Sequence, residues 1–355
     1  MAKIPKKAAK PICISLFAGC GGLDLGVEQA GFRIAVATDA DSTCAKTYKL
    51  NSPRVPYIVG KIASISTQQV LEAGGIESET VDLLIGGPPC PSFSKSRFYR
   101  TEKPRALDDP VAAETVGGYL RVLGDVRPRA FILENVKGLA YGVLKEALDH
   151  IIKTAEGLGY STSVHLVNAA DYGAPQIRER CFVIGSLEGE VSGPKVTHSK
   201  DSFGGEKLKP WVTAGDVLSD LDTDEMANDD GHFAGGRHNE VLKGIPPGQN
   251  YLFYTAERGH PLPLFKWRSR YWSFLLKLSP DLPSWTIQAR RSNNMGPLHW
   301  RNRILRIEEV KRLQTFPDSF VLAGNVEKQW RQIGNAVPPL LAKHFAYAIK
   351  KHLAK

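Results

Sequence analysis

The sequence lacks any apolar run long enough to cross a bilayer. Its longest apolar stretches, such as residues 130–133, are far shorter than the roughly 20 residues that a membrane helix needs. The basic first ten residues are not followed by an apolar segment of secretory length. We therefore expect no membrane partner and a cytoplasmic location.

Cysteine is scarce, and the cysteines form no recognisable pairing pattern. The five are Cys13, Cys20, Cys44, Cys90 and Cys181. They contain no CxxC pair and accompany no histidine cluster at metal-ligand spacing. We expect free thiols in a reducing compartment and no metal site.

Acidic residues are outnumbered, with 37 Asp and Glu against 46 Lys and Arg, which gives a net charge of +9. A basic protein favours a polyanionic partner without proving one. Between residues 266 and 306 there are nine basic residues against one acid, Asp281, with Trp and Tyr interleaved. This stretch indicates either nucleic-acid contact or a solvated face over aromatic core residues. The basic residues are Lys266, Arg268, Arg270, Lys277, Arg290, Arg291, Arg301, Arg303 and Arg306.

The length of 355 residues favours about two domains, and the pattern differs between the halves. Short β-branched runs alternate with helical stretches up to about residue 188, which is typical of βαβ units around a parallel sheet. The predicted strands are 12–17, 34–38, 81–85, 130–134, 163–168 and 181–185, and the predicted helices include 23–30, 143–156 and 340–353. We predict an α/β fold with a doubly wound sheet in the first half. A smaller, less regular module follows it.

A glycine-rich segment, residues 17–22 (FAGCGG), lies between a predicted strand and a predicted helix. Glycine lets the backbone approach a ligand at the carboxyl edge of a parallel sheet. Asp39 ends the next predicted strand, where a carboxylate can accept hydrogen bonds from ribose hydroxyls. Such turns serve many nucleotide ligands and some bind none, but together these residues indicate an adenosine-containing cofactor.

Cys90 lies in GGPPCPSFS, directly after the predicted strand 81–85. The surrounding prolines stiffen the loop and lower the entropy of positioning the sulfur. A lone cysteine is more often an inert buried residue. Its place in a rigid polar loop favours a nucleophile instead.

Three further polar residues follow predicted strands. Glu134 ends the strand 130–134, where it could be a helix cap or a functional acid. Arg178 and Arg180 are two residues apart and would face the same side of an extended segment. They could bind a phosphate, a base oxygen or neighbouring acids.

Read in order, the motifs SLFAGCGGLDLGVEQAGF, ATDAD, GGPPCPSFS, ENV, DYGAPQIRER, RLQTFPDSF and QIGNAVPP resemble those of DNA cytosine-5 methyltransferases of the prokaryotic restriction-modification type. The resemblance covers about the first 185 residues and the chain from about residue 286 onward. It implies a Rossmann-like methyltransferase sheet with a smaller target-recognition domain. The implied domains are 1–188 for catalysis and cofactor binding, 189–300 for target recognition, and 301–355 returning to the catalytic domain.

The resemblance implies catalysis by Cys90, Glu134, Arg178 and Arg180. The thiolate of Cys90 would add to carbon 6 of cytosine, which makes carbon 5 electron-rich. Glu134 would hold N3 and the exocyclic amine, and Arg180 the base O2. Arg178 would brace Glu134 or contact the DNA backbone.

The implied cofactor is S-adenosylmethionine, with Phe17 stacking on adenine, Asp39 on the ribose and Asn335 near the methionine end. The remaining expected contacts are Ala18, Gly19, Gly21, Gly22, Leu23, Ala40, Ile62 and Pro88. The sequence departs from the family pattern at Ser15 and Lys61, where a carboxylate is usual, and at Asp39, where Glu is usual. We expect activity to survive these departures.

The implied partner is double-stranded DNA, with a cognate restriction endonuclease that acts on the same site and need not touch this chain. The target base must leave the stack, and the basic loop 94–109 is a candidate for the element that clamps phosphates. A nucleoid-associated cytoplasmic location follows from this role. The expected DNA contacts are Ser92, Ser94, Arg97, Arg237, Arg290, Arg291 and Arg303.

Two alternatives remain open. One branch of the family methylates tRNA, but residues 190–300 contain no cysteine and so lack that branch's Cys-Phe-Thr signature. A sequence-specific DNA-binding regulator that has lost catalysis is the other alternative. The presence of Cys90, Glu134 and Arg180 argues against it.

Overall fold

The computed structural model describes residues 9–89, 108–201, 208–223, 233–268 and 271–355. The chain divides into two compact units. Unit 1 comprises Met1–Val167, Glu179–Pro194 and Ala342–Lys355, and unit 2 comprises Asn168–Arg178 and Lys195–Leu341. The domain boundaries given above concern function and remain a prediction.

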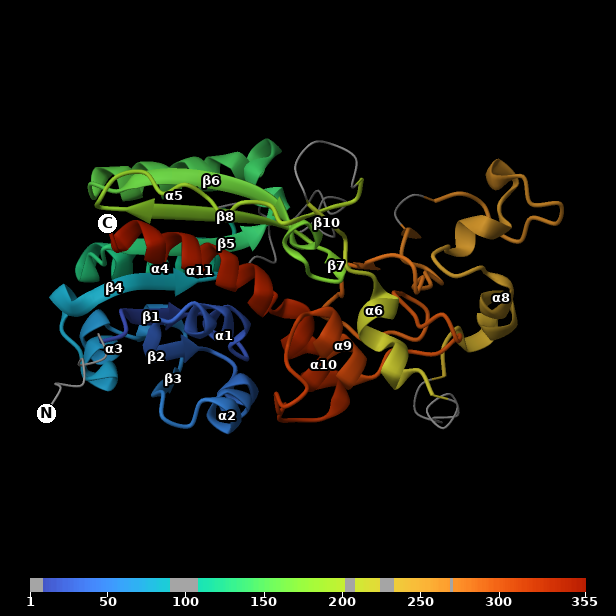
Figure 1. Ribbon diagram of the computed structural model, residues 1–355, viewed down its shortest axis with the longest axis horizontal. Coiled ribbons are helices and arrows are strands. Elements are labelled where there is room, and N and C mark those ends of the chain that lie inside the picture. Colours follow the sequence, from blue (N-terminus) through green and yellow to red (C-terminus); the bar gives the residue numbers. More distant parts are fainter. Residues whose placement is uncertain (1–8, 90–107, 202–207, 224–232, 269–270) are drawn as a thin grey trace, which may run out of the picture. The chain divides into compact units, whose positions relative to one another are not determined.

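A seven-stranded sheet forms the centre of unit 1, in the order β3-β2-β1-β4-β5-β8-β6 (Figure 1). Its strands are β1 (Ile12–Leu16), β2 (Arg33–Asp39), β3 (Tyr57–Val59), β4 (Val81–Gly86), β5 (Ala130–Val136), β6 (Ser161–Asn168) and β8 (Glu179–Ser186). The first five strands in this order pair in parallel, and β8 runs antiparallel to β5. All six strands predicted from the sequence are present, and β3 is additional.

Alternating side chains of the strands build a hydrophobic layer on each face of the sheet. On one face, Ile14 and Leu16 of β1 pack in a buried core that includes Val116 and Leu123 of α4 (Pro110–Val126). On the other face, Phe345 of α11 (Pro339–Leu353) stacks on Phe182 of β8 with ring centroids 3.9 Å apart. Figure 1 shows α11 in front of the sheet and α4 behind it. The sheet is therefore covered on both sides, as a doubly wound fold requires.

The helices of unit 1 begin and end at residues that suit those positions. Asp109 caps α4 by accepting hydrogen bonds from the backbone of Val111 and Ala112, and Pro110 occupies the first turn. Gly31, which follows the end of α1, has φ +96°, a conformation that glycine adopts without strain. The remaining helices of this unit are α1 (Gly22–Gln29), α2 (Ser42–Asn51), α3 (Thr67–Gly74) and α5 (Lys145–Gly157).

Unit 2 is much less regular, as its glycine- and proline-rich sequence predicts. Its strands are two-residue pairs, β7 (Gln176–Ile177) with β11 (Ser284–Trp285), and β9 (His198–Ser199) with β10 (Lys209–Pro210). The α-helices among its described residues are α6 (Ala214–Leu218), α8 (Asn239–Gly244), α9 (Ile307–Leu313) and α10 (Val326–Asn335). Among the described residues of the whole chain, no helix is both long enough and apolar enough to span a membrane.

Candidate active site and DNA interface

The sheet register brings the functional segments of unit 1 to one edge. Leu16 at the end of β1 pairs with Gly86 at the end of β4, and Gly86 pairs with Leu133 of β5. Because β8 is antiparallel, its beginning lies at this same edge, where Arg180 pairs with Val136. The segments after β1, β4 and β5 therefore meet where ligands bind in open α/β sheets.

The 17–22 turn exposes its backbone and is anchored by Asp39. The Asp39 carboxylate accepts hydrogen bonds from the backbone N–H of Gly19 at 3.0 Å and of Asp41 at 2.8 Å. Gly19 has φ +55°, and a Cβ added there would meet no atom within 4 Å. Phe17 shares the left-handed conformation, with φ +55°, which is uncommon for a bulky residue and marks a constrained turn. This open turn beside an acid fits an adenosine-containing ligand.

Burial raises the pKa of Asp39, although the hydrogen bonds from Asp41 and Gly19 oppose that rise. Both bonds hold the carboxylate in a fixed orientation. Its neighbour Ala40 is exposed. Asp39 is thus the last residue of β2, as the sequence predicts, and Ala40 follows it.

Two tyrosines that could not be identified from the sequence pack against the 17–22 turn. Tyr57 donates a hydrogen bond of 2.9 Å from its hydroxyl to the carbonyl of Gly19. The ring of Tyr48 lies against Gly21, where an added Cβ would come within 3.0 Å of it. The two rings pack with centroids 4.9 Å apart. Only the fold reveals this pair, because Tyr57 lies 38 residues beyond Gly19 in a three-residue strand.

Ile62 and Pro88 are buried at the expected places after β3 and β4. Arg121 of α4 donates hydrogen bonds to the carbonyls of Ile62 at 3.0 Å and Ile65 at 2.8 Å, so the helix fixes this turn. Lys61, where the family pattern has an acid, is exposed.

Glu134 and Arg180 form a largely buried ion pair, with Arg180 Nε 2.9 Å from Glu134 Oε1. Burial lowers the pKa of Arg180, and the adjacent carboxylate of Glu134 opposes that effect. A Cβ added to Gly87 would lie 3.1 Å from Glu134 Oε2. The carboxylate therefore lies beside the backbone that leads into the GGPPC loop. Cys90 itself lies outside the described residues, as do Ser92, Ser94 and Arg97.

Arg178 and Arg180 bind different partners, and Arg178 is not the contact to the DNA backbone that the resemblance implies. Arg178 lies between β7 and β8, belongs to unit 2 and is 1% exposed. Its guanidinium donates to the carbonyls of Gly334 at 2.8 Å and Ala336 at 2.9 Å, and also to that of Ile287. A group this deeply buried is not available to a DNA phosphate. Since Gly334 and Ala336 flank Asn335, whose side chain is exposed, Arg178 instead fixes the turn that presents Asn335.

Arg303 is also a structural residue, and the prediction that it contacts DNA is wrong. It is 5% exposed and forms two parallel hydrogen bonds to Glu309, at 2.8 and 2.6 Å. Burial tends to raise the pKa of Glu309, but the hydrogen bonds from Arg303 and Arg306 and the nearby charges of Arg303 and His299 together outweigh it, so the pKa is lowered. Lys277 and Arg306 are likewise buried, so the basic stretch is not one continuous interface.

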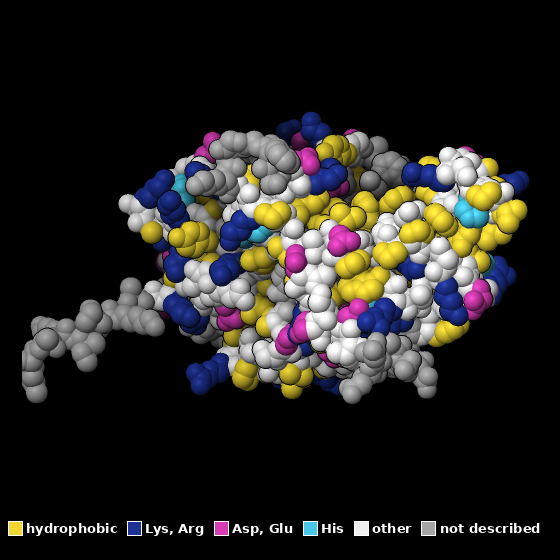
Figure 2. All heavy atoms as spheres, turned by 45° about the vertical axis from the view of Figure 1, so that its right-hand side comes forward, with side chains coloured by type: hydrophobic (Ala, Val, Ile, Leu, Met, Phe, Trp, Pro, Cys, Tyr) yellow, Lys and Arg dark blue, Asp and Glu magenta, His cyan; other side chains and the backbone are white. Residues whose placement is uncertain are grey.

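Other basic residues of unit 2 are accessible. Arg237 and Arg290 are exposed, as are Lys266 and Arg268. Aromatic side chains also reach the surface nearby in sequence, among them Trp267, which is 44% exposed. Figure 2 shows hydrophobic side chains interleaved with Lys and Arg on the face of the molecule that it draws. The accessible set is suited to a polyanion with exposed bases.

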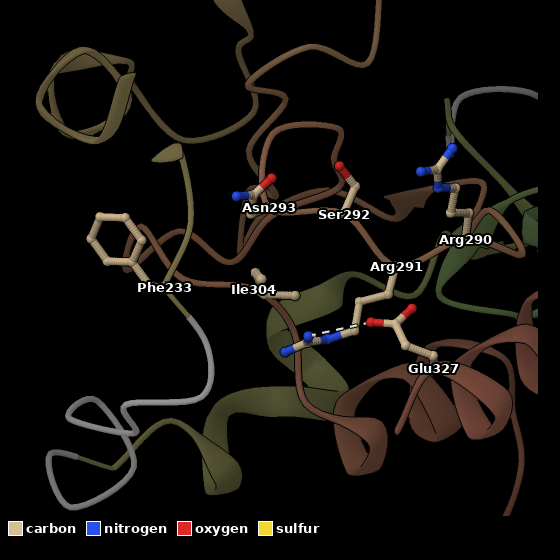
Figure 3. A pocket seen from close by; sticks show the side chains of 7 residues that line it. All are labelled: Phe233, Arg290, Arg291, Ser292, Asn293, Ile304 and Glu327. Atoms are coloured by element: carbon tan, nitrogen blue, oxygen red, sulfur yellow. Dashed lines mark ion pairs between the residues drawn. The ribbon is translucent and has the colours of Figure 1, made fainter. Parts of the chain in front are cut away.

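A cavity of about 500 Å³ in unit 2 combines such groups (Figure 3). Arg291 forms an ion pair with Glu327 beside it, with Nη1 3.6 Å from Oε1. Its lining consists of Phe233, Arg290, Arg291, Ser292, Asn293, Ile304 and Glu327. Guanidinium, amide and hydroxyl groups around one hollow provide both donors and acceptors for base edges.

Comparison with known proteins gives consistent matches along the chain. Residues 12–351 match the family described as C-5 cytosine-specific DNA methylase. The chain is 39% identical over 367 residues to the Type II methyltransferase M.SacI of Streptomyces achromogenes, an alignment that covers 96% of this chain and 93% of that protein. It is 32% identical over 357 residues to the Type II methyltransferase M.NgoPII of Neisseria gonorrhoeae, with 96% of each covered.

Solved structures agree on the architecture. A DNA modification methyltransferase encoded within a prophage (E. coli) superposes with a TM-score of 0.70 at 23% identity, over 97% of this chain and 99% of that one. The likeness confirms the predicted α/β methyltransferase fold.

Proposed function

Since the chain belongs to the C-5 cytosine-specific DNA methylase family, we propose that it methylates carbon 5 of a cytosine flipped out of duplex DNA, with S-adenosylmethionine as methyl donor and Cys90 as covalent nucleophile. The enzyme is a C-5 cytosine DNA methyltransferase of the restriction-modification type.

The observation that carries the proposal is the Glu134–Arg180 pair beside Gly87. A carboxyl group and a guanidinium held side by side match the polar edge of cytosine, because the carboxyl can hold N3 and the exocyclic amine while the guanidinium donates to O2. The pair needs no large rearrangement to receive the base, since each partner already keeps the other in place. Its position beside Gly87 supports base recognition next to the segment that carries Cys90.

In the proposed covalent step, the thiolate of Cys90 forms a bond to carbon 6 of the ring. The electron pair of the C5–C6 double bond moves toward carbon 5, and a proton from Glu134 at N3 neutralises the developing charge. After carbon 5 is methylated it loses its proton to water, the C5–C6 double bond re-forms, the thiolate leaves and N3 returns its proton to Glu134. A free thiol has a pKa of about 8.5, so the bound base or a nearby arginine must promote its ionisation.

The residues of the 17–22 turn fit the cofactor. The open backbone at Gly19 and the oriented Asp39 carboxylate suit the ribose and methionine portions, and Phe17 with Ile62 supplies apolar surface for adenine. When bound there, S-adenosylmethionine supplies a methyl group activated by a sulfonium. Asn335, Gly21, Gly22, Leu23, Ala18, Ala40 and Pro88 complete the proposed set.

For DNA contact we propose the exposed Arg237 and Arg290 and the cavity-lining Arg291, with Ser92, Ser94 and Arg97 from the segment after Cys90. Modification of one DNA site would protect it from a cognate restriction endonuclease that need not contact this chain. A reducing cytoplasm with access to the nucleoid suits this role.

A direct test incubates the purified protein with methyl-labelled S-adenosylmethionine and either duplex DNA or tRNA, and then sequences the modified DNA for 5-methylcytosine. We expect label on duplex DNA at one sequence context and none on tRNA. Label on tRNA alone would establish the RNA-directed alternative, and binding of DNA without any label would establish a regulator that has lost catalysis.

A further inference from the structure

A cluster of three buried polar groups lies beneath the 17–22 turn and takes no part in the reaction described above. Its members are Ser15 on β1, Asp24 on α1 and Tyr48 on α2, each no more than 2% exposed. Neither oxygen of Asp24, nor the hydroxyl of Ser15 or Tyr48, has a hydrogen-bond partner of standard geometry within the described residues. Buried polar groups without partners are rare, so each such group calls for an explanation.

The three groups are close enough to satisfy one another. Burial raises the pKa of Asp24 to about 7, and the hydroxyls of Ser15 and Tyr48 partly oppose this rise, which shows that both act on the carboxyl group. Two hydroxyls can donate and one carboxylate can accept both bonds. Small side-chain rotations would therefore convert three unpaired groups into one hydrogen-bonded unit.

This unit is connected to the cofactor turn on both sides. Ser15 lies two residues before Phe17, and Asp24 lies two residues after Gly22, where α1 begins. The ring of Tyr48 contacts Gly21 and packs on Tyr57, which in turn donates to the carbonyl of Gly19. A hydrogen bond that holds the Tyr48 hydroxyl would therefore also hold the two rings that contact Gly19 and Gly21.

We propose that Asp24 is a positioning residue for cofactor binding: its carboxyl group, held between Ser15 and Tyr48, sets the shape of the 17–22 turn. The family pattern has a carboxylate at the position of Ser15 on β1, and this chain lacks it. We infer that Asp24 on α1 provides a carboxyl group at the same buried place. This inference rests on the proposed use of S-adenosylmethionine.

The charged and titratable surroundings of Asp24 make the unit sensitive to pH. Glu28 on the same helix further raises the pKa of Asp24, while Asp24 in turn raises that of Cys13 on β1, of Cys20 in the turn and of Tyr48 on α2. No cation is among the described groups that shift Asp24. The carboxyl therefore ionises near neutral pH, and the ionised form has both oxygens free to accept, one from each hydroxyl, whereas the protonated form has one oxygen occupied by a proton that it must itself donate.

A reciprocal exchange tests the proposal, with S-adenosylhomocysteine as the probe and its affinity measured by calorimetry on the full chain. Asp24→Ser removes the only carboxyl group and Ser15→Asp places two together, so each should weaken binding about tenfold or more. The double variant Ser15→Asp with Asp24→Ser restores one carboxyl and should bind within about threefold of wild type. Glu146→Ser, which removes an exposed carboxylate on α5, is the matched control and should bind like wild type.

A second measurement separates positioning from mere stability. Wild-type affinity for the probe should rise between pH 6 and pH 8, whereas Asp24→Asn, which keeps the shape but cannot ionise, should not show this rise. Additive losses in the double variant, or identical pH profiles for wild type and Asp24→Asn, would overturn the inference while leaving the proposed function intact. A wild-type protein that binds no S-adenosylhomocysteine would overturn the proposed function and this inference with it.

Discussion

At the scale of single residues, two ion pairs of the same composition occupy different surroundings. Glu134 and Arg180 keep about a tenth of each side chain accessible at the open edge of the sheet. Arg303 and Glu309 are enclosed in unit 2, where the backbone N–H of Arg306 also donates to the carboxylate. A pair that can be reached is available for a substrate, whereas an enclosed pair can only stabilise the fold.

Glu134→Gln should reduce methyl transfer to duplex DNA at least 100-fold, because an amide cannot supply the proton that general acid catalysis requires. Affinity for S-adenosylhomocysteine should change less than threefold. Glu179→Gln, which alters an exposed neighbour at the same edge, serves as the control and should retain activity. Near-normal initial rates for Glu134→Gln would remove this carboxylate from the mechanism.

Arg303→Gln should lower the free energy of unfolding by about 3–5 kcal/mol, since it leaves the Glu309 carboxylate buried without its cation. The exposed Arg290→Gln should change stability by less than about 0.5 kcal/mol. Urea denaturation of both variants would measure the difference. Equal midpoints would contradict the structural role of Arg303.

Asp24 should make stability decrease as pH rises. Its pKa is about 7 in the folded protein and 3.8 is its ordinary value, so between these values the native state holds a proton that the unfolded state has lost. The stabilisation present at low pH is therefore lost as the pH rises to about 7, by up to roughly 4 kcal/mol. The free energy of unfolding of Asp24→Asn should decline less steeply than that of wild type between pH 4 and pH 7. Parallel plots of unfolding free energy against pH for the two proteins would show that Asp24 does not titrate in this range.

At the scale of elements, the long buried strands were predictable because each is a nearly continuous apolar run between turn signals. The two-residue strands β7 and β11 were not, since they pair across more than 100 residues and carry no periodicity of their own. The same limit explains Arg178, whose partners at Gly334 and Ala336 lie over 150 residues away. Candidate site residues at the ends of strands could be predicted from the sequence. The residues of other elements that hold them in position could not.

Helix α4 controls the turn at Ile62 through a close contact at Gly118. A Cβ at Gly118 would lie 2.4 Å from Ile62 Cγ2, whereas one at the adjacent Gly117 would meet no atom within 4 Å. Gly118→Val should therefore displace the turn and weaken S-adenosylhomocysteine binding about tenfold. Gly117→Val carries the same change of helix propensity and should bind normally. Equal affinities for the two variants would show that α4 does not set the position of Ile62.

At the scale of the whole molecule, the charge of +9 has a specific distribution. Within the basic stretch 266–306, burial removes Lys277, Arg303 and Arg306 from any interface, a fact that composition could not reveal. Exposed members such as Lys266, Arg268 and Arg290 remain available to phosphates. Within this stretch, only the accessible residues therefore remain candidates for contact with nucleic acid.

Lys266→Ala, Arg268→Ala and Arg290→Ala should each weaken DNA binding and reduce the slope of log affinity against log salt by about 1, because each phosphate contact releases counterions. Lys153→Ala, an exposed change on α5, should leave the slope unaltered. Fluorescence anisotropy over a range of salt concentrations measures these slopes. Unchanged slopes in all three variants would place the interface elsewhere.

The central claim is that Cys90 attacks carbon 6 of a flipped cytosine, and a mechanism-based trap tests it most directly. A duplex with 5-fluorocytosine in place of the target cytosine cannot lose the substituent at carbon 5, so the enzyme should remain bonded to it in the presence of S-adenosylmethionine. We predict a complex that survives denaturation with wild type and is absent with Cys90→Ser. A wild-type enzyme that methylates ordinary duplex DNA yet forms no such complex, or a Cys90→Ser variant that forms it equally, would contradict the account.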